Sequence, residues 1–136
     1  MRLVKNDLRE FPLFAGASRA ELARIAQLLT MVTVPAGKVL VREGAGASEF
    51  MVIVEGEVEV TQGGRTIATL GRGDLVGEMA LVQERGQNRR NATVTALTDM
   101  VIYVGSQVEF REILLAAPSV ADKVHQTIAS RTLVAA

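Results

Sequence analysis

Short apolar or alternating runs separated by glycine fill residues 31 to 104, and this pattern restricts the fold more than any other feature of the chain. The runs are Met31 to Val34, Val39 to Val41, Met51 to Val54, Val58 to Thr61, Thr66 to Leu70, Thr93 to Leu97 and Val101 to Val104. Each run is too short for a stable helix but has the length of a strand. Their number and spacing favour an antiparallel sandwich or barrel over a parallel sheet. The turn Gln62-Gly63-Gly64-Arg65 has the residues of a tight hairpin.

The segments on either side of these runs have helical periodicity. Residues 1 to 30 contain a first short segment ending near Phe11-Pro12, followed by Ser18 and Glu21 at the spacing of a capping box. The apolar residues of the helix that follows recur at helical spacing: Leu22, Ile25, Ala26 and Leu29. Residues 106 to 136 are expected to form two further helices. We expect Pro118 to end or bend the first of them and Ser119 to cap the second.

Length and composition limit the class of protein. A chain of 136 residues, 49% of them apolar, fits a single domain over residues 1–136 with a real core. It contains no apolar run long enough to span a membrane, and the charged N-terminus does not resemble a signal peptide. The absence of cysteine excludes disulfides, thiolate metal sites and a cysteine nucleophile, and a cytoplasmic location is the simplest expectation.

Charge and histidine content argue against two functional classes. The 15 basic and 15 acidic side chains cancel, so the net charge gives no indication of a nucleic-acid-binding surface. His125 is the only histidine, so a metal centre built from several histidines is excluded. His125 also lies in a helical run without a nucleophile motif nearby, and we therefore expect no catalytic residues and no metal site.

The stretch from residue 73 to 93 carries the strongest functional signal. Gly73 and Gly77 allow backbone angles that other residues resist, and residues 78–81 can form one helical turn directly after Gly77. The free N–H groups at the start of such a turn favour an anion. These amides could hold a phosphate with the main chain alone.

Two charged side chains refine this prediction. The guanidinium of Arg90 presents a planar fork suited to two phosphate oxygens, whereas ionised Glu78 would repel a phosphate but can accept hydrogen bonds from a sugar hydroxyl. Together they suit a ligand in which a sugar is joined to a phosphate. The alternatives are that Glu78 only complements the helix dipole and that Arg90, like Arg89, is a solvated charge at a strand end.

The chain contains an ordered set of short motifs: Pro35-Ala36-Gly37, Arg42-Glu43-Gly44, residues 52–58, Gly77-Glu78-Met79-Ala80-Leu81 and Arg90-Asn91-Ala92-Thr93. This set resembles the cyclic nucleotide-binding domain of catabolite-activator-like regulators, cyclic-nucleotide-dependent kinases and gated channels. The resemblance implies an α+β, mainly β fold. Its parts are an eight-stranded antiparallel β-barrel (jelly roll) with a phosphate-binding cassette at 73–93, an N-terminal helix and C-terminal lid helices.

The resemblance also implies roles for individual residues. Gly77 would open the phosphate-binding turn, and Glu78 would bind the ribose 2′-hydroxyl. The amides of Met79 and Ala80 would bind the cyclic phosphate, and Arg90 would pair with its charged oxygen. Either arginine could serve as the phosphate ligand, but the register Arg-x-Ala-Thr favours Arg90.

Further positions complete the implied pocket. Asn91 stands where the family tunes the choice between adenine and guanine, and Ala92 and Thr93 would line the wall. Val76 replaces an aromatic residue that usually precedes the cassette glycine. Arg131, in the last helix, would contact the base or act in the lid, although a cation near a helix C-terminus is equally well explained by the helix dipole.

The leading hypothesis is a sensing module that binds a cyclic nucleotide, cAMP before cGMP, needs no cofactor and performs no chemistry. The alternative is an interaction domain that keeps the barrel but no longer binds nucleotide, suggested by the extended polar loop at 83–88. The output would pass to an effector protein, to a homodimer through the C-terminal helices, or to another domain. Direct DNA binding is not expected, because residues 106–136 leave no room for a helix-turn-helix unit beside the closing helices.

Overall fold

The computed structural model describes residues 8–46, 49–77 and 90–135, with the side chains of the last helix described as far as Thr127. The chain divides into two compact units. One contains Met1–Thr30 together with Gly105–Ala136, and the other contains Met31–Val104. The division therefore falls where the sequence changes from helical periodicity to short glycine-bounded runs.

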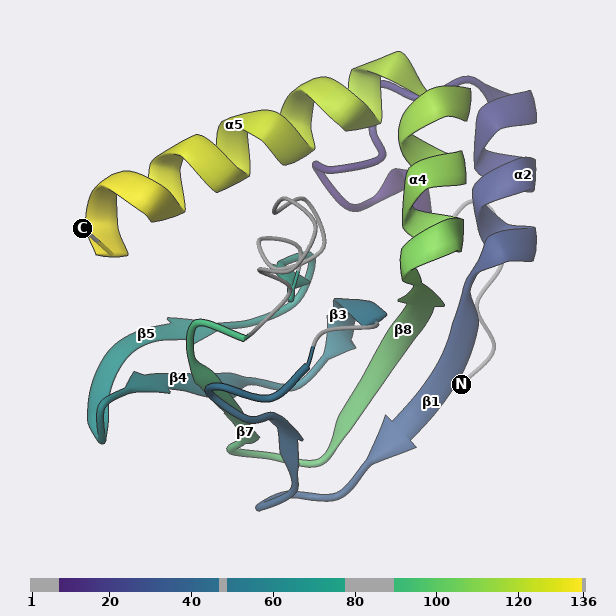
Figure 1. Cartoon of the computed structure of the whole chain (residues 1–136). Helices are drawn as coiled ribbons and strands as arrows, with labels where there is room; N and C mark the ends of the chain where they lie inside the picture. Colours follow the sequence, from purple (N-terminus) through teal and green to yellow (C-terminus); the bar gives the residue numbers. More distant parts are fainter. Residues whose placement is uncertain (1–7, 47–48, 78–89, 136) are drawn as a thin grey trace. The chain divides into compact units, whose positions relative to one another are not determined.

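Strands occupy the central unit (Figure 1). Their bounds are β1 Thr30–Val34, β2 Val39–Val41, β3 Glu49–Glu55, β4 Val58–Gln62, β5 Arg65–Leu70, β6 Leu75–Val76, β7 Thr93–Ala96 and β8 Met100–Ser106. In the described part of the chain they form two four-stranded sheets, in the orders β1-β8-β3-β6 and β2-β7-β4-β5. The predicted eight-stranded antiparallel jelly roll is confirmed, with its strands divided between these two sheets.

Inward-facing apolar side chains of both sheets form the core of this unit. The first sheet contributes Val34, Met51, Ile53, Val76, Met100 and Ile102, and the second contributes Val41, Val58, Val94 and Ala96. Ile53 and Val58 are fully buried. Burying a side chain of this size stabilises the fold by about 1.5–3 kcal/mol, so the apolar runs that mark the strands in the sequence also hold the sheets together.

The tight turn between β4 and β5 forms as its glycines require. Gln62 pairs with Arg65, and Gly63 and Gly64 have φ angles of 59° and 79°. Two successive positive φ angles match the right-handed twist of a hairpin. The predicted turn is confirmed. By contrast, β6 was not predicted, because Leu75–Val76 is too short to show a strand period.

Three helices of the other unit have described bounds: α2 Arg19–Leu28, α4 Gln107–Ala116 and α5 Pro118–Ala135. The predicted capping box at the start of α2 is present, since the Ser18 hydroxyl accepts from the Glu21 amide and the Glu21 carboxylate accepts from the Ser18 amide. The short segment expected before it falls partly on residues 1–7, outside the described residues. From Leu8 onward the chain makes successive turns, with Phe11 donating to Leu8 and Phe14 to Phe11.

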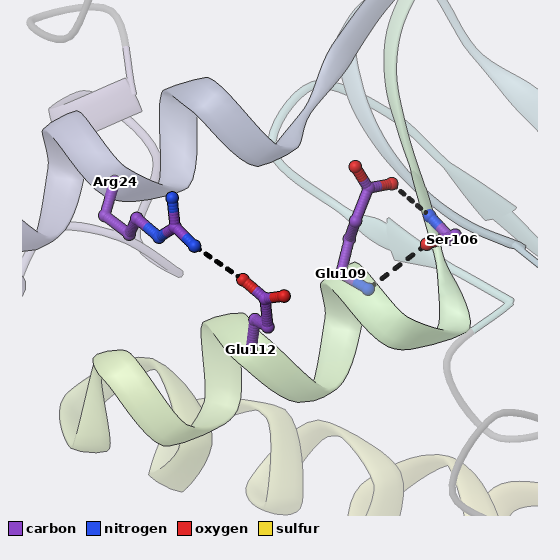
Figure 2. Close-up of polar contacts among 4 residues, drawn as sticks. All are labelled: Arg24, Ser106, Glu109 and Glu112. Carbon is purple, nitrogen blue, oxygen red and sulfur yellow. Dashed lines mark hydrogen bonds and ion pairs between the residues drawn. The ribbon is translucent and has the colours of Figure 1, made fainter.

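An ion pair and a capping box involve residues of α4 (Figure 2). Arg24 of α2 reaches the Glu112 carboxylate at 2.7 Å. Ser106 and Glu109 form a second capping box at the start of α4, with distances of 3.1 Å from the Glu109 amide to the Ser106 hydroxyl and 2.8 Å from the Ser106 amide to the Glu109 carboxylate. This second box was not predicted, although its Ser-x-x-Glu spacing is visible in the sequence.

The expected cap at the start of α5 is wrong. Helix α5 begins at Pro118, so Ser119 lies inside its first turn rather than before it. Proline suits the first helical position, because its φ is already helical and its missing N–H would have no partner there. The Ser119 hydroxyl is buried and has no hydrogen-bond partner among the described residues.

Candidate functional site

Arg90 is the only charged side chain that is buried among the residues the structure describes, at 8% exposure. Its Nη1 donates to the carbonyl oxygen of Gly77 at 3.0 Å, and its Nη2 donates to that of Glu49 at 2.7 Å. A buried charge is tolerated only when hydrogen bonds replace the water it has lost. The two carbonyls therefore both offset the burial of the guanidinium and fix the direction of its planar fork.

The main chain of Arg90 is fixed as well. Its amide donates to the carbonyl of Ala45 at 2.9 Å, and its carbonyl accepts from the amide of Gly44 at 2.8 Å. These bonds attach Arg90 to the turn that follows β2. The side chain and the backbone of Arg90 are thus held independently, which limits the positions open to the guanidinium.

Gly77 occupies a position that no other residue fits without rearrangement. It follows β6, whose Val76 pairs with Met51 of β3, and its φ is +85°. A Cβ at residue 77 would lie 2.4 Å from Nη1 of Arg90 and 3.2 Å from the carbonyl oxygen of Glu49. Glycine is therefore required twice, once by the backbone angle and once by the close approach of the guanidinium.

Arg90 lies against the residue at which the predicted phosphate-binding turn begins. The sequence placed Gly77 and Arg90 in one site, and the structure brings them into hydrogen-bond contact. Glu78, Met79 and Ala80, together with Arg89, lie outside the described residues. The side chain of Arg131 in α5 lies outside them as well, so the roles predicted for these residues stay predictions.

The residues after Arg90 make contacts within the protein. The Thr93 hydroxyl oxygen accepts from the Glu43 amide at 3.0 Å, and the Asn91 carbonyl accepts from Nε2 of Gln62 at 2.9 Å. Asn91 is exposed, and Ala92 and Thr93 are half-buried. Val76, which the resemblance assigned to the pocket, is 2% exposed and packs in the core between the sheets.

Sequence reasoning did not identify three groups that position these residues. The Glu49 carbonyl is a backbone group, so no side-chain pattern could have revealed it. The Glu43 carboxylate accepts from the Gly63 amide at 2.9 Å, and Gln62 contacts Asn91 through its side chain. Glu43 belongs to one of the motifs that carry the family resemblance, which was the available signal.

Two kinds of arrangement were sought among the described residues, a cluster of metal-ligating side chains and a membrane-length helix. Within 8–46, 49–77 and 90–135, no group of three or more His, Cys, Asp or Glu side chains is arranged to hold a metal ion. The helices of this part of the chain include none that is both long enough and apolar enough to cross a bilayer.

Comparison with known proteins identifies the family. A model of the cyclic nucleotide-binding domain matches residues 31–116, which include both sheets and Arg90. The chain belongs to the cyclic nucleotide-binding domain family. The resemblance predicted from the sequence is confirmed.

Relatives and solved structures agree with this assignment. The cAMP-dependent protein kinase regulatory subunit of Schizosaccharomyces pombe is 33% identical over 113 residues, covering 82% of this chain and 27% of the relative. The crystal structure of Thermus thermophilus catabolite activator protein is 26% identical with a TM-score of 0.79, covering 91% of this chain and 59% of that one. A cAMP-bound PfPKA-R structure has a TM-score of 0.85 at 20% identity and covers 96% of this chain and 44% of that one. This likeness supports the fold.

The chain spans only part of these proteins. It covers 27% of the length of the Schizosaccharomyces pombe subunit and about a third or less of the channel relatives from Rhodopseudomonas palustris and Rhizobium etli. In these relatives, the part that resembles this chain is a minor fraction of a longer protein. The family assignment therefore describes a regulatory binding domain.

Proposed function

We propose that this chain binds a cyclic purine mononucleotide, cAMP in preference to cGMP, and anchors its phosphate on Arg90. The observation that carries the proposal is the buried guanidinium held against Gly77 by the carbonyls of residues 77 and 49. No other arginine of the described residues is buried.

The chemistry of a cyclic phosphodiester fits this arrangement. The ligand carries one negative charge on two exocyclic oxygens, and a guanidinium can pair with both through charge-assisted hydrogen bonds. Because the Arg90 guanidinium is shielded from water, its attraction for an anion is stronger than that of an arginine on the open surface. Its orientation is also set before the ligand arrives, so little side-chain entropy is lost on binding.

The remaining contacts follow from the order of residues along the chain. Glu78, Met79 and Ala80 come directly after Gly77, so their carboxylate and amides start from the residue that contacts Arg90. We propose that Glu78 binds the ribose hydroxyl and that the two amides bind the phosphate. Asn91 and Arg131 are proposed to contact the base. The preference for cAMP is supported by the similarity to the cAMP-dependent protein kinase regulatory subunit of Schizosaccharomyces pombe.

We further propose that the C-terminal helices transmit binding. In this scheme, α4 and α5 close in response to the nucleotide and pass the change to an effector protein or to a second copy of the chain. A ligand shifts such an equilibrium only as far as its affinity differs between the two states. Binding should therefore raise the melting temperature and change the hydrogen exchange of α4 and α5 together.

Calorimetric titration tests the proposal. The wild type is titrated with cAMP, cGMP and linear 5′-AMP, and two arginine variants are titrated with cAMP. We expect saturable one-to-one binding of cAMP, weaker binding of cGMP and no binding of 5′-AMP. Arg90→Ala should abolish binding, whereas Arg65→Ala, at the exposed hairpin, should bind like the wild type. Absence of heat and of thermal shift with either cyclic nucleotide at millimolar concentration would leave the non-binding interaction domain as the remaining interpretation.

A further inference from the structure

We infer that Glu43 is a positioning residue for Arg90 and sets the affinity for cyclic nucleotide without touching it. This inference rests on the proposed function. It is carried by a set of hydrogen bonds that joins three segments distant in sequence. These segments are the turn 43–45, the hairpin residues 62–63 and the segment 90–93.

The regular strand pairing that supports β7 stops before it reaches Arg90. The β2–β7 pairing extends to Val41 opposite Val94, and the β4–β7 pairing extends to Thr61 opposite Thr93. In the described ladders, residues 90–92 therefore lie beyond the last paired position of β7. Their placement has to come from other contacts.

The turn 43–45 supplies the first set of these contacts. The Glu43 amide donates to the Thr93 hydroxyl at 3.0 Å, the Gly44 amide donates to the Arg90 carbonyl at 2.8 Å, and the Ala45 carbonyl accepts from the Arg90 amide at 2.9 Å. The turn thus holds both ends of the segment 90–93. A displacement of the turn would be passed directly to Arg90.

The hairpin supplies the second set. The Gln62 side chain donates to the Asn91 carbonyl at 2.9 Å, in the middle of the segment that the turn holds at its ends. The Glu43 carboxylate accepts from the Gly63 amide at 2.9 Å and so joins the turn to the hairpin. Each of the three segments is therefore bonded to the other two. Glu43, in the turn, bonds both to the hairpin and to the segment 90–93.

Replacing the Glu43 side chain removes the bond to the Gly63 amide. The bonds that the main chain of the turn makes to residues 90 and 93 stay possible. Glu43 is exposed and packs against no core residue cluster, so its replacement creates no cavity. Without its carboxylate, the turn and the hairpin are no longer tied directly to each other. The guanidinium of Arg90 would then sample a wider range of positions, and small displacements of a binding group reduce affinity strongly.

The test compares the cAMP affinity of the wild type with those of three variants, measured by calorimetry, with melting temperatures recorded in parallel. Glu43→Ala should bind about five- to tenfold more weakly, the range expected from the loss of one hydrogen bond that orders the site. Glu43→Gln should bind within about twofold of the wild type, because its amide oxygen can accept from Gly63 in the same way. Glu57→Ala is the matched control. Glu57 is also exposed, and it directly precedes Val58, the first residue of β4.

A ligand-independent measurement accompanies the titrations. Hydrogen exchange of the Gly63 amide, followed by NMR, should be slow in the wild type and in Glu43→Gln and fast in Glu43→Ala. Rescue by glutamine in both measurements would support a role as hydrogen-bond acceptor in positioning.

Three results would overturn the inference. Glu43→Ala could bind cAMP as tightly as the wild type, which would leave the proposed function standing and remove only the positioning role. Glu43→Gln could be as weak as Glu43→Ala, which would assign the effect to charge. A wild type that binds no cyclic nucleotide would defeat the proposed function and this inference together. Were Glu43→Ala to fail to fold, Glu43→Asp would serve in its place, with the shorter side chain expected to weaken binding.

Discussion

Substituting alanine at two glycines with nearly identical backbone angles separates the cost of the angle from the effect on Arg90. Gly77 has φ +85° and Gly37 has φ +88°. A Cβ at Gly37 would meet nothing within 4 Å, whereas a Cβ at Gly77 would lie 2.4 Å from Nη1 of Arg90. Gly37→Ala is therefore the matched control for Gly77→Ala.

The magnitudes follow from these two environments. An alanine held at positive φ costs about 1–2 kcal/mol at either position. At Gly77 the guanidinium must also move by about 1 Å to reach ordinary van der Waals contact at 3.4 Å, which weakens its bonds to the Gly77 and Glu49 carbonyls. Leaving those buried groups poorly paired costs about 1–3 kcal/mol more. Because a charge-assisted hydrogen bond contributes about 1.5–3 kcal/mol, displacing the guanidinium should weaken cAMP binding by about 10- to 100-fold.

Thermal melts and calorimetry on the two variants check these values. Gly37→Ala should lower the melting temperature by several degrees and keep the wild-type affinity for cAMP. Gly77→Ala should melt at a lower temperature than Gly37→Ala and should also lose most of its affinity. If both variants melt alike and bind cAMP alike, the contact between Gly77 and Arg90 does not determine the geometry of the site.

Four further substitutions test the fold and the site. Arg90→Lys keeps the charge but loses the planar fork, and should reduce cAMP affinity by at least about tenfold in the same titration. Ser106→Ala removes the capping box of α4 and should destabilise the protein by about 1 kcal/mol in denaturant unfolding. Ile53→Ala leaves a cavity in the core and should cost about 2–5 kcal/mol in the same unfolding experiment. Arg24→Ala breaks an ion pair whose side chains are 53% and 43% exposed, and should change stability by less than about 1 kcal/mol, with the difference shrinking at high salt.

Most of the strands could be predicted because each is an apolar run bounded by a residue that allows a turn. Seven predicted runs overlap observed strands, and β2 has the predicted bounds Val39–Val41. The exception, Leu75–Val76, is a strand because it pairs with Met51 and Val52 of β3, and this long-range pairing has no local signature. The start of α5 was misplaced for a local reason, since both Pro118 and Ser119 favour a helix start and proline took the first helical position.

Only part of the candidate site could be predicted. The glycine at 77 and the arginine at 90 belong to a recognisable motif, and the free amides expected after Gly77 together with the charge of Arg90 suggested an anion. The contacts that fix them could not be foreseen. The Glu49 contact uses a backbone carbonyl, a group that every residue type has. The bond between Glu43 and Gly63 depends on how a turn and a hairpin approach each other in three dimensions.

The decisive experiment is a crystal structure of the protein grown with cAMP. We expect a phosphate oxygen within hydrogen-bond distance of the Arg90 guanidinium, with the bonds from Arg90 to the carbonyls of Gly77 and Glu49 retained. Cyclic nucleotide bound elsewhere on the protein, with Arg90 making no contact to its phosphate, would contradict it.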